Sequence, residues 1–284
     1  MVCHPFHKTA CKTSGFVRHK ATECAFTTSD SWVILNPIEQ SIKRKIEAVG
    51  TPLKDWDIKI NRGILTGCNE AFIIDEEKRQ ELIAQDPRSA EIIRPILRGR
   101  DIKRYGYNFA GLYLIAAHNG VPEKDIPRVN IDDYPAVKRH LDQYWDKIST
   151  RSDKGDTPYN LRSCAYMEDF NQQLIVYNDI AQRLTFAMTS AGTFTNNTVY
   201  FIKGEEKTLC YLLAYLNSNL IDWYYRTLSV QLGTKAVRMF SIYMEKLPIP
   251  LFEMGKNAPH NETEIFESYG LNEEEIKYLL KKTS

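Results

Sequence analysis

The chain has 284 residues, of which 43% are hydrophobic and 11% are aromatic, enough to bury a sizeable core in one large domain or two smaller ones. No window approaches 18 uncharged apolar residues, and the first 30 residues carry His, Lys, Cys and Thr where a signal peptide would be apolar. We therefore expect a folded cytoplasmic protein without a membrane partner.

The formal net charge of +1 hides an uneven distribution along the chain. Between Ile92 and Arg104, five cationic residues face one aspartate, which gives a local balance of +4. From Glu262 to Ser284, six glutamates face three lysines, which gives a local balance of −3. This pattern predicts a basic segment and an acidic tail.

Residues 1–35 are rich in cysteine and histidine but match no standard metal site. Their spacing contains no C-x-x-C pair and follows no zinc-finger pattern, so we predict no metal. The six cysteines of the chain are too scattered for a disulfide framework, and reduced thiols are expected. We expect residues 1–35 to be a leader, poorly ordered or a truncation remnant; its possible ligands are Cys3, His4, His7, Cys11, His19 and Cys24.

Residues 36–50 have the pattern of an amphipathic helix of about three turns. Ile38, Ile42 and Ile46 recur every four residues, with Pro37 near the start and Gly50 just past the end.

The next stretch alternates Trp56, Ile58 and Ile60, which predicts a half-buried strand that runs into a glycine-punctuated loop. The loop lies within INRGILTGCNEAFIID, residues 60–75. Gly63 and Gly67 have neither the P-loop spacing nor the G-x-G-x-x-G spacing of dinucleotide sites, so a nucleotide cofactor is disfavoured. A short apolar strand and a polar helix are expected after it.

Helices and strands alternate through the rest of the chain. We expect a helix end and a loop around Pro95, and a single apolar helix over residues 208–228. Residues 271–282 predict a short helix capped by Asn272 in the acidic tail. The fold class is therefore mixed α+β, with further strands expected at 112–118, 172–179, 197–204 and 241–251 and a further helix at 134–151.

The standard catalytic signatures are missing from the sequence: it has no H-E-x-x-H, no G-x-S-x-G and no Walker motif. His118 and His140 are isolated, and we interpret them as a strand-end and a helix-surface histidine. Cys68 has no histidine within forty residues, so a buried structural thiol is favoured.

The loops share residue types that suit DNA. Arg and Lys match phosphate oxygens and guanine edges, and Asn matches the adenine edge. Ordinary solvated loop charges remain an alternative on composition alone. The candidate DNA-binding residues are Arg62, Thr66, Asn69, Arg98, Arg100, Lys103, Arg104, Arg151, Lys154, Tyr159, Arg162, Asn196, Asn197 and Lys235. Arg238, in the same stretch as Lys235, has the same character.

Six ordered blocks over residues 60–250 give the sequence a family resemblance. It resembles the TaqI-like C-terminal specificity domain, the target-recognition part of adenine-specific DNA methyltransferases and fused type IIG restriction-modification enzymes. Its LNS-bearing helix and later LPIP strand also look like the recognition domains of type I specificity subunits. The blocks are INRGILTGCNEAFIID, IIRPILRGRDIKRYG, YPAVKRHLDQY, RSDKGDTPYNLRSCAY, LLAYLNSNLIDWYY and LPIP.

The resemblance implies a recognition domain over residues 36–252, with a mixed sheet, packed helices and DNA-facing loops, followed by the acidic tail at 253–284. It implies double-stranded DNA and a methyltransferase domain or subunit as partners. The glycines of the opening loop would then allow close approach to DNA.

The sequence departs from the family pattern in its catalytic parts. The Asn-Pro-Pro-Tyr and S-adenosylmethionine motifs are absent, and so is the combined Pro-Asp and Glu-x-Lys signature of the nuclease. We expect S-adenosylmethionine, and Mg²⁺ if a nuclease exists, to bind elsewhere in the parent enzyme, of which this chain would be the carboxy-terminal piece, a split subunit or a gene remnant.

Two other functions remain open from the sequence. One is an enzyme with an unrecognised site near Cys68 or Tyr166, and the other is a protein-binding or structural module that uses the helix from Leu209 to Tyr225.

Overall fold

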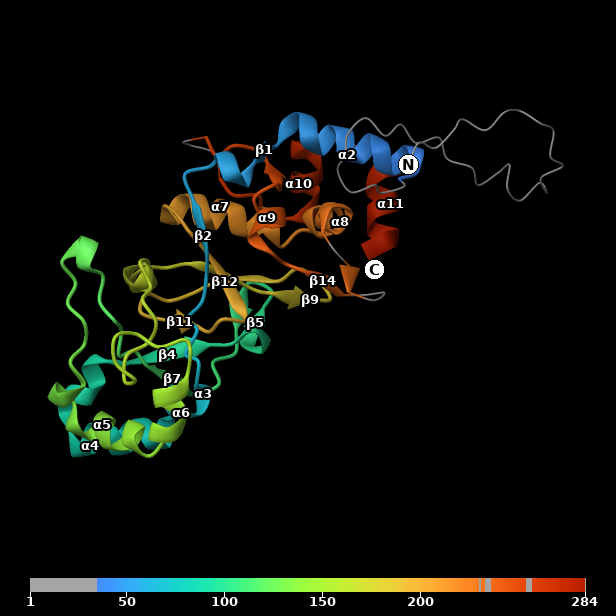
Figure 1. Cartoon of the computed structure of the whole chain (residues 1–284). Coiled ribbons are helices and arrows are strands. Elements are labelled where there is room, and N and C mark those ends of the chain that lie inside the picture. The colour runs from blue at the N-terminus through green and yellow to red at the C-terminus, as the bar shows by residue number, and fades with distance from the viewer. Residues whose placement is uncertain (1–34, 230, 233–235, 254–256, 284) are drawn as a thin grey trace, which may run out of the picture.

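The computed structural model describes residues 35–229, 231–232, 236–253 and 257–283. The cysteines and histidines of the leader lie outside these residues. The fold is mixed α/β, as expected: two four-stranded sheets lie between a group of helices from both ends of the chain and a second group from its middle (Figure 1). The first sheet contributes buried side chains to both of two hydrophobic clusters, one on each of its faces, and the second sheet contributes to the second cluster.

The first sheet is antiparallel, and its strand order is β10-β8-β12-β2. Continuous apolar runs make the two central strands, which is why both faces are buried. The strands predicted at 172–179 and 197–204 are confirmed. The bounds are β2 Lys59–Arg62, β8 Ile175–Asn178, β10 Phe186–Met188 and β12 Val199–Lys203.

The second sheet has the order β11-β4-β7-β3, and only its β11–β4 pair is parallel. The expectation of a helix end before Pro95 was wrong, because this proline lies inside β4. At Pro95 the strand is paired with β7 alone, since β11 joins only at Ile96 and Leu97, and a proline is tolerated there. The bounds are β3 Ile73–Asp75, β4 Ile93–Leu97, β7 Leu112–Ile115 and β11 Phe194–Thr195.

Short helices cover the second sheet at the end of the molecule opposite α2 (Figure 1). The single helix expected over 134–151 is two helices, which are separated at Gln143 and Tyr144. His140 is buried rather than on the helix surface, and its Nε2 lies 3.0 Å from the Ala71 carbonyl oxygen. Burial lowers the pKa of His140. The bounds are α3 Asn69–Phe72, α4 Glu76–Gln85, α5 Pro135–Asp142 and α6 Trp145–Thr150.

The helix expected over 208–228 is also broken, into α7 (Glu206–Leu216) and α8 (Asn219–Leu228). The Asn217 side chain accepts a hydrogen bond from the Phe186 amide and donates one to the Phe186 carbonyl, both 3.0 Å long. Ser218 then caps α8 by accepting from the Ile221 amide. The LNS block is therefore a helix-to-helix corner that is fastened to the edge strand β10.

Both ends of the described chain pack on this corner. α2 (Pro37–Val49) begins with a capping box between Asn36 and Glu39. Residues 253–284 contain two helices, α10 (Glu262–Ser268) and α11 (Glu273–Thr283), and Asn272 accepts from the Glu275 amide as the predicted cap. Their buried side chains share one hydrophobic cluster with α2, α7 and α8; they are Ile265, Phe266, Tyr269 and Leu279.

Three small strand sets complete the fold. The strand predicted over 241–251 is instead helix α9 (Ser241–Met244) followed by a two-residue strand that pairs with β1. Among the described residues, no helix has the length and apolarity needed to cross a membrane. The sets are β1 (Thr51–Pro52) with β15 (Pro248–Ile249), β5 (Ile102–Lys103) with β6 (Gly106–Tyr107), and β13 (Gln231–Leu232) with β14 (Ala236–Arg238) and β9 (Ile180–Ala181).

The packing of α11 predicts a large cost for truncating its buried leucine. Leu279 is fully buried in the cluster, so Leu279→Ala should lower the free energy of unfolding by about 2–5 kcal/mol. Leu251 is 53% exposed, and Leu251→Ala, the matched control, should change it by less than about 0.5 kcal/mol. Urea unfolding of both variants measures the difference; equal values would show that the tail is not part of the core.

Candidate nucleic-acid interface

The two sheets meet where β2 leaves the first sheet and passes beside the β11–β12 connection. The Ile64 amide donates to the Thr195 carbonyl at 2.7 Å, and Ile64 forms a parallel bridge with Asn196. The Gly63 amide donates to the Val199 carbonyl at 2.8 Å. We call this crossing the joint, and define it as Gly63 and Ile64 packed against residues 195–199.

The joint explains why a glycine occupies position 63. A Cβ atom there would lie 2.1 Å from the Asn196 carbonyl oxygen and 2.5 Å from Thr195 Oγ1. Gly63 is buried, so its missing side chain makes room for the protein's own backbone and not, as expected from the resemblance, for DNA. Gly67 is exposed, and its φ of +67° is a left-handed conformation that glycine adopts freely.

Arg62 and Asn197 lie side by side at the solvent edge of the joint. Arg62 Nε donates to the Asn197 carbonyl at 2.6 Å, and its guanidinium lies 3.7 Å from Asp179 and 5.5 Å from the Tyr200 ring centre. Its side chain remains 50% exposed. Asn196 is buried, where its Oδ1 accepts from the amide and the hydroxyl of Thr198. Asn196 therefore shapes the turn, while Arg62 and Asn197 reach the surface.

The basic segment is fastened to the same joint. The Gly99 amide donates to Thr198 Oγ1 at 3.1 Å. Arg98 binds Asp101 through Nε and Nη2 at 3.0 and 2.9 Å. Burial disfavours the charge of Asp101, but the hydrogen bonds from Arg98 outweigh it and hold the pKa of this carboxyl below its ordinary value. Arg98 is thus occupied inside the loop, and Arg100 beside it is exposed.

Lys103 and Arg104, two further cations of this segment, also differ in whether they serve protein contacts. Lys103 is exposed, and its Nζ donates to the Arg100 carbonyl at 3.0 Å. Arg104 donates to the Asn217 carbonyl at 2.8 and 3.1 Å and lies 3.2 Å from Glu262. Arg104 therefore ties the β5–β6 hairpin to the helix corner and to α10.

Arg151 joins the glycine loop to the loop at 151–162 from inside the protein. Its Nη1 donates to the Thr66 carbonyl and to the Asp153 carbonyl, the latter at 2.8 Å. Its Nη2 donates to the carbonyls of Pro158 and Asn160 at 3.1 and 2.5 Å. The residue is 7% exposed, and burial lowers its pKa. Arg151 is thus unavailable for direct contact with DNA.

Several predicted contacts surround these two loops. Thr66 is buried and donates to Asn69 Oδ1 at 2.6 Å, while Asn69 itself is exposed. Tyr159 donates to Asp142 at 2.6 Å, and burial with this hydrogen bond raises the pKa of Tyr159 to about 12. Lys154 donates to the Ser149 carbonyl and is exposed.

The structure thus separates the predicted residues that it describes into three groups: interior residues, residues that serve protein contacts, and surface residues. Lys235 lies outside the described residues. Thr66, Arg151 and Asn196 are interior. Arg98, Arg104 and Tyr159 serve protein contacts. Arg162 is 64% exposed, 3.5 Å from Asp153. The surface group, which we call the reading surface, is Arg62, Asn69, Arg100, Lys103, Lys154, Arg162 and Asn197.

Cys68 and Tyr166, the residues named for a possible enzyme site, have structural roles. Cys68 is buried, as predicted, in the second hydrophobic cluster. The Tyr166 hydroxyl donates to the Arg62 carbonyl at 3.0 Å, so it holds the backbone at the joint. Sequence reasoning missed this role, and that of Thr198, because both depend on contacts between distant segments.

Comparison with known proteins places the chain in a family. The TaqI-like C-terminal specificity domain matches residues 94–249, more than half of the chain. The chain belongs to this family. The match includes the basic segment, the loop at 151–162 and the joint's 195–199 segment, but begins after the glycine loop.

Relatives of this specificity domain are longer proteins. The type II methyltransferase M.BstVI of Geobacillus stearothermophilus is 21% identical over 231 residues, which are 79% of this chain and 39% of the relative. The type IIL restriction-modification enzyme MmeI, solved in complex with DNA, has a TM-score of 0.52 and 12% identity over 82% of this chain and 32% of its own. The type IIG restriction endonuclease BpuSI has a TM-score of 0.49 and 14% identity over 82% and 27%. The chain spans about two fifths or less of each.

The joint predicts that position 63 will not accept a side chain. Gly63→Ala would force the Asn196 carbonyl to move, so it should destabilise the fold by roughly 1–3 kcal/mol. Gly106 has nothing within 4 Å of a Cβ position, so Gly106→Ala is the matched control and should be near neutral. Thermal unfolding compares the two; equal midpoints would refute close packing at the joint.

The contacts of Arg151 predict a structural cost for removing it. Arg151→Ala would leave four carbonyl oxygens without this donor, and should lower the free energy of unfolding by roughly 2–4 kcal/mol. Arg162→Ala, at an exposed arginine of the same loop, should change it by less than about 0.5 kcal/mol. Chemical denaturation tests this, and an unchanged stability in Arg151→Ala would return that residue to the surface group.

Proposed function

We propose that the chain is a target-recognition module that binds double-stranded DNA in a sequence-specific manner and supplies target choice to an adenine-specific methyltransferase of a restriction-modification system. Family membership supports this function. The observation that carries it to particular residues is the joint, where Arg62, Asn197 and Arg100 reach solvent from loops that are fixed by their own backbone contacts.

The reading surface supplies two kinds of contact. Arginine and lysine side chains would neutralise phosphates and set the register of the protein on the duplex. Asn197 and Asn69 would offer an amide that pairs with the adenine edge, where a good bidentate pair is worth roughly 1–3 kcal/mol against the wrong base. Because the loops are held by backbone hydrogen bonds, little ordering is needed on binding.

The chemistry would belong to a partner domain or subunit. This sequence lacks the methyltransferase motifs, so we assign S-adenosylmethionine to that partner. Among the described residues no group of three His, Cys, Asp or Glu side chains is placed to hold a metal ion, and we assign the Mg²⁺ of any fused nuclease to the parent enzyme. Because duplex DNA is the proposed ligand, we also propose the cytoplasm as the protein's location.

Binding of duplex DNA by the whole chain, with a randomised-site selection and a salt titration, tests the function. Arg100→Ala should weaken binding to every duplex and reduce the log-log salt slope by about 0.9, the value for one phosphate. Asn197→Ala should instead relax the preference at one base position.

Arg44→Ala, at an exposed arginine on α2, is the control and should leave both properties unchanged. Failure of the wild-type chain to bind duplex DNA at low salt would refute the function. Equal effects of Arg44→Ala and Arg100→Ala on binding would refute the assignment of DNA contacts to the reading surface.

A further inference from the structure

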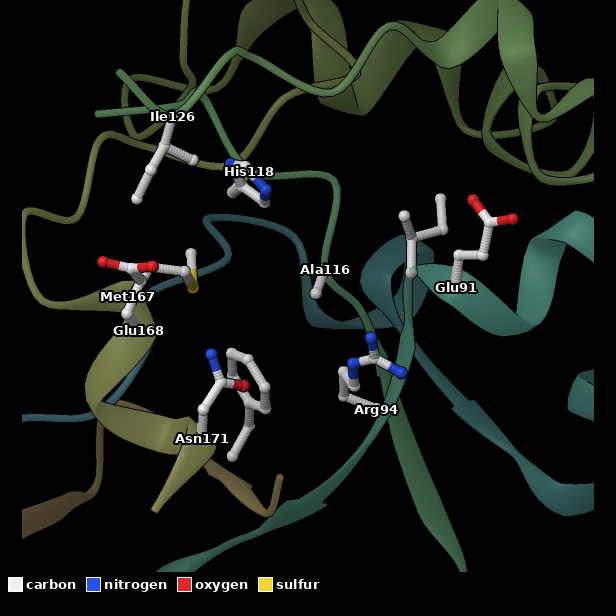
Figure 2. A pocket seen from close by; sticks show the side chains of 10 residues that line it. Glu91, Arg94, Ala116, His118, Ile126, Met167, Glu168 and Asn171 are labelled. Carbon is white, nitrogen blue, oxygen red and sulfur yellow. The ribbon is translucent and has the colours of Figure 1, made fainter. Parts of the chain in front are cut away.

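A cavity of about 210 Å³ opens beside the second sheet (Figure 2). Arg94 of β4 and the segment that follows β7 contribute one wall, and the short helix at Met167–Asn171 contributes another. Its volume far exceeds the roughly 10–15 Å³ that one water molecule needs, so a ring-sized ligand fits. No residue of the reading surface lines it; its lining includes Arg94, His118, Met167, Asn171 and Phe194.

Three polar side chains converge on this space with hydrogen-bonding capacity left over. His118 Nδ1 accepts from the Gly120 amide at 3.0 Å, which leaves the proton on Nε2 as a donor. Arg94 donates only to the Ala90 carbonyl, at 3.3 Å, and no carboxylate of the described residues lies within ion-pair distance. Asn171 has no partner among them. Figure 2 shows all three side chains around the cavity.

The rest of the lining is apolar or already paired. Phe194 is 5% exposed, and its ring is already stacked on that of Phe170 at a centroid distance of 4.5 Å, so only a small part of it borders the cavity. Ile92, just before β4, and Ala116, just after β7, lie beside it. Glu91 accepts from the Tyr134 hydroxyl at 2.9 Å, and Glu168 lies 3.9 Å from Lys124. The free groups are therefore mainly donors beside an apolar wall, an arrangement that suits a flat ring with acceptor atoms on its edge.

The cavity is close to the joint along the chain and in space. Tyr166, whose hydroxyl holds the Arg62 carbonyl, directly precedes the lining residue Met167. The strand β4 carries Arg94 near its start and leads directly, at its end, to the turn that carries Arg100. A nucleotide that leaves a duplex bound on the reading surface could thus be held by the same two elements.

We propose that this cavity binds a single unstacked nucleobase, with guanine favoured because Arg94 and the His118 Nε2–H can donate to its O6 and N7 edge while the apolar wall at Ile92, Ala116 and Phe194 borders the ring. If the base comes from bound DNA, the proposal rests on the proposed function. If the ligand is a free nucleoside, it does not. Asn171 supplies an amide to either source.

Two binding experiments on the whole chain separate the sources. The first titrates guanosine and, for comparison, thymidine. The second compares a fully paired duplex with the same duplex carrying a one-nucleotide guanine bulge. We expect guanosine to bind more tightly than thymidine and the bulge to raise affinity about tenfold, in the lower half of the range for one bidentate base contact. Arg94→Ala and Asn171→Ala should each remove most of these differences, whereas Arg44→Ala should keep them.

The outcomes distinguish the cavity from the proposed function. The base-binding role of the cavity is refuted if the chain binds paired duplex but prefers neither the bulge nor guanosine. It is also refuted if Arg94→Ala and Asn171→Ala leave such a preference intact. In both cases the proposed function still stands. Guanosine binding that Arg94→Ala removes, in a chain that binds no duplex, supports the cavity and overturns the function. Thermal unfolding of the variants checks the fold, and Asn171, which is exposed, can be changed without disturbing the core.

Discussion

The close backbone contact at Gly63 is the constraint on which the arrangement of the two sheets depends. β2 and the β11–β12 connection pass so near to each other that even a methyl group would collide with the Asn196 carbonyl. The same crossing sets the positions of Arg62 on one segment and Asn197 on the other. A separation of the two sheets would therefore disturb the hydrophobic clusters and the reading surface together.

Arginine side chains hold the irregular loops near the joint and at the helix corner in place, and the reason is chemical. A guanidinium has five donors in a planar fork, so one buried side chain can satisfy several carbonyl oxygens of irregular backbone. Arg151 does this for the loops at 63–69 and 151–162. Arg104, which is exposed, uses two of its donors on the single carbonyl of Asn217 at the helix corner. Such loops lack the ladder of a sheet, and their carbonyls would otherwise be left without partners.

Much of the fold was predictable because hydrophobic periodicity is a local signal. α2, β8 and β12 follow it, and Cys68 is buried as expected. The breaks were not predictable. Asn217 ends α7 because it finds the backbone of Phe186, which is 31 residues away. The same limit applies to the site: Thr66, Arg151 and Arg162 look alike as polar loop residues, and only tertiary burial decides which of them can meet DNA.

Arginine and asparagine side chains therefore have two roles in this domain: some hold the loops in place, and others reach the surface. Arg98 is held by Asp101, and this bidentate pair fixes the turn from which Arg100 projects. Asn196 is held by Thr198, and it fixes the turn from which Asn197 projects. In both places a residue whose side chain is hydrogen-bonded within its own turn supports a nearby residue that reaches the surface. Sequence choice could change at the exposed positions while the supporting partners, and with them the joint, stay as they are.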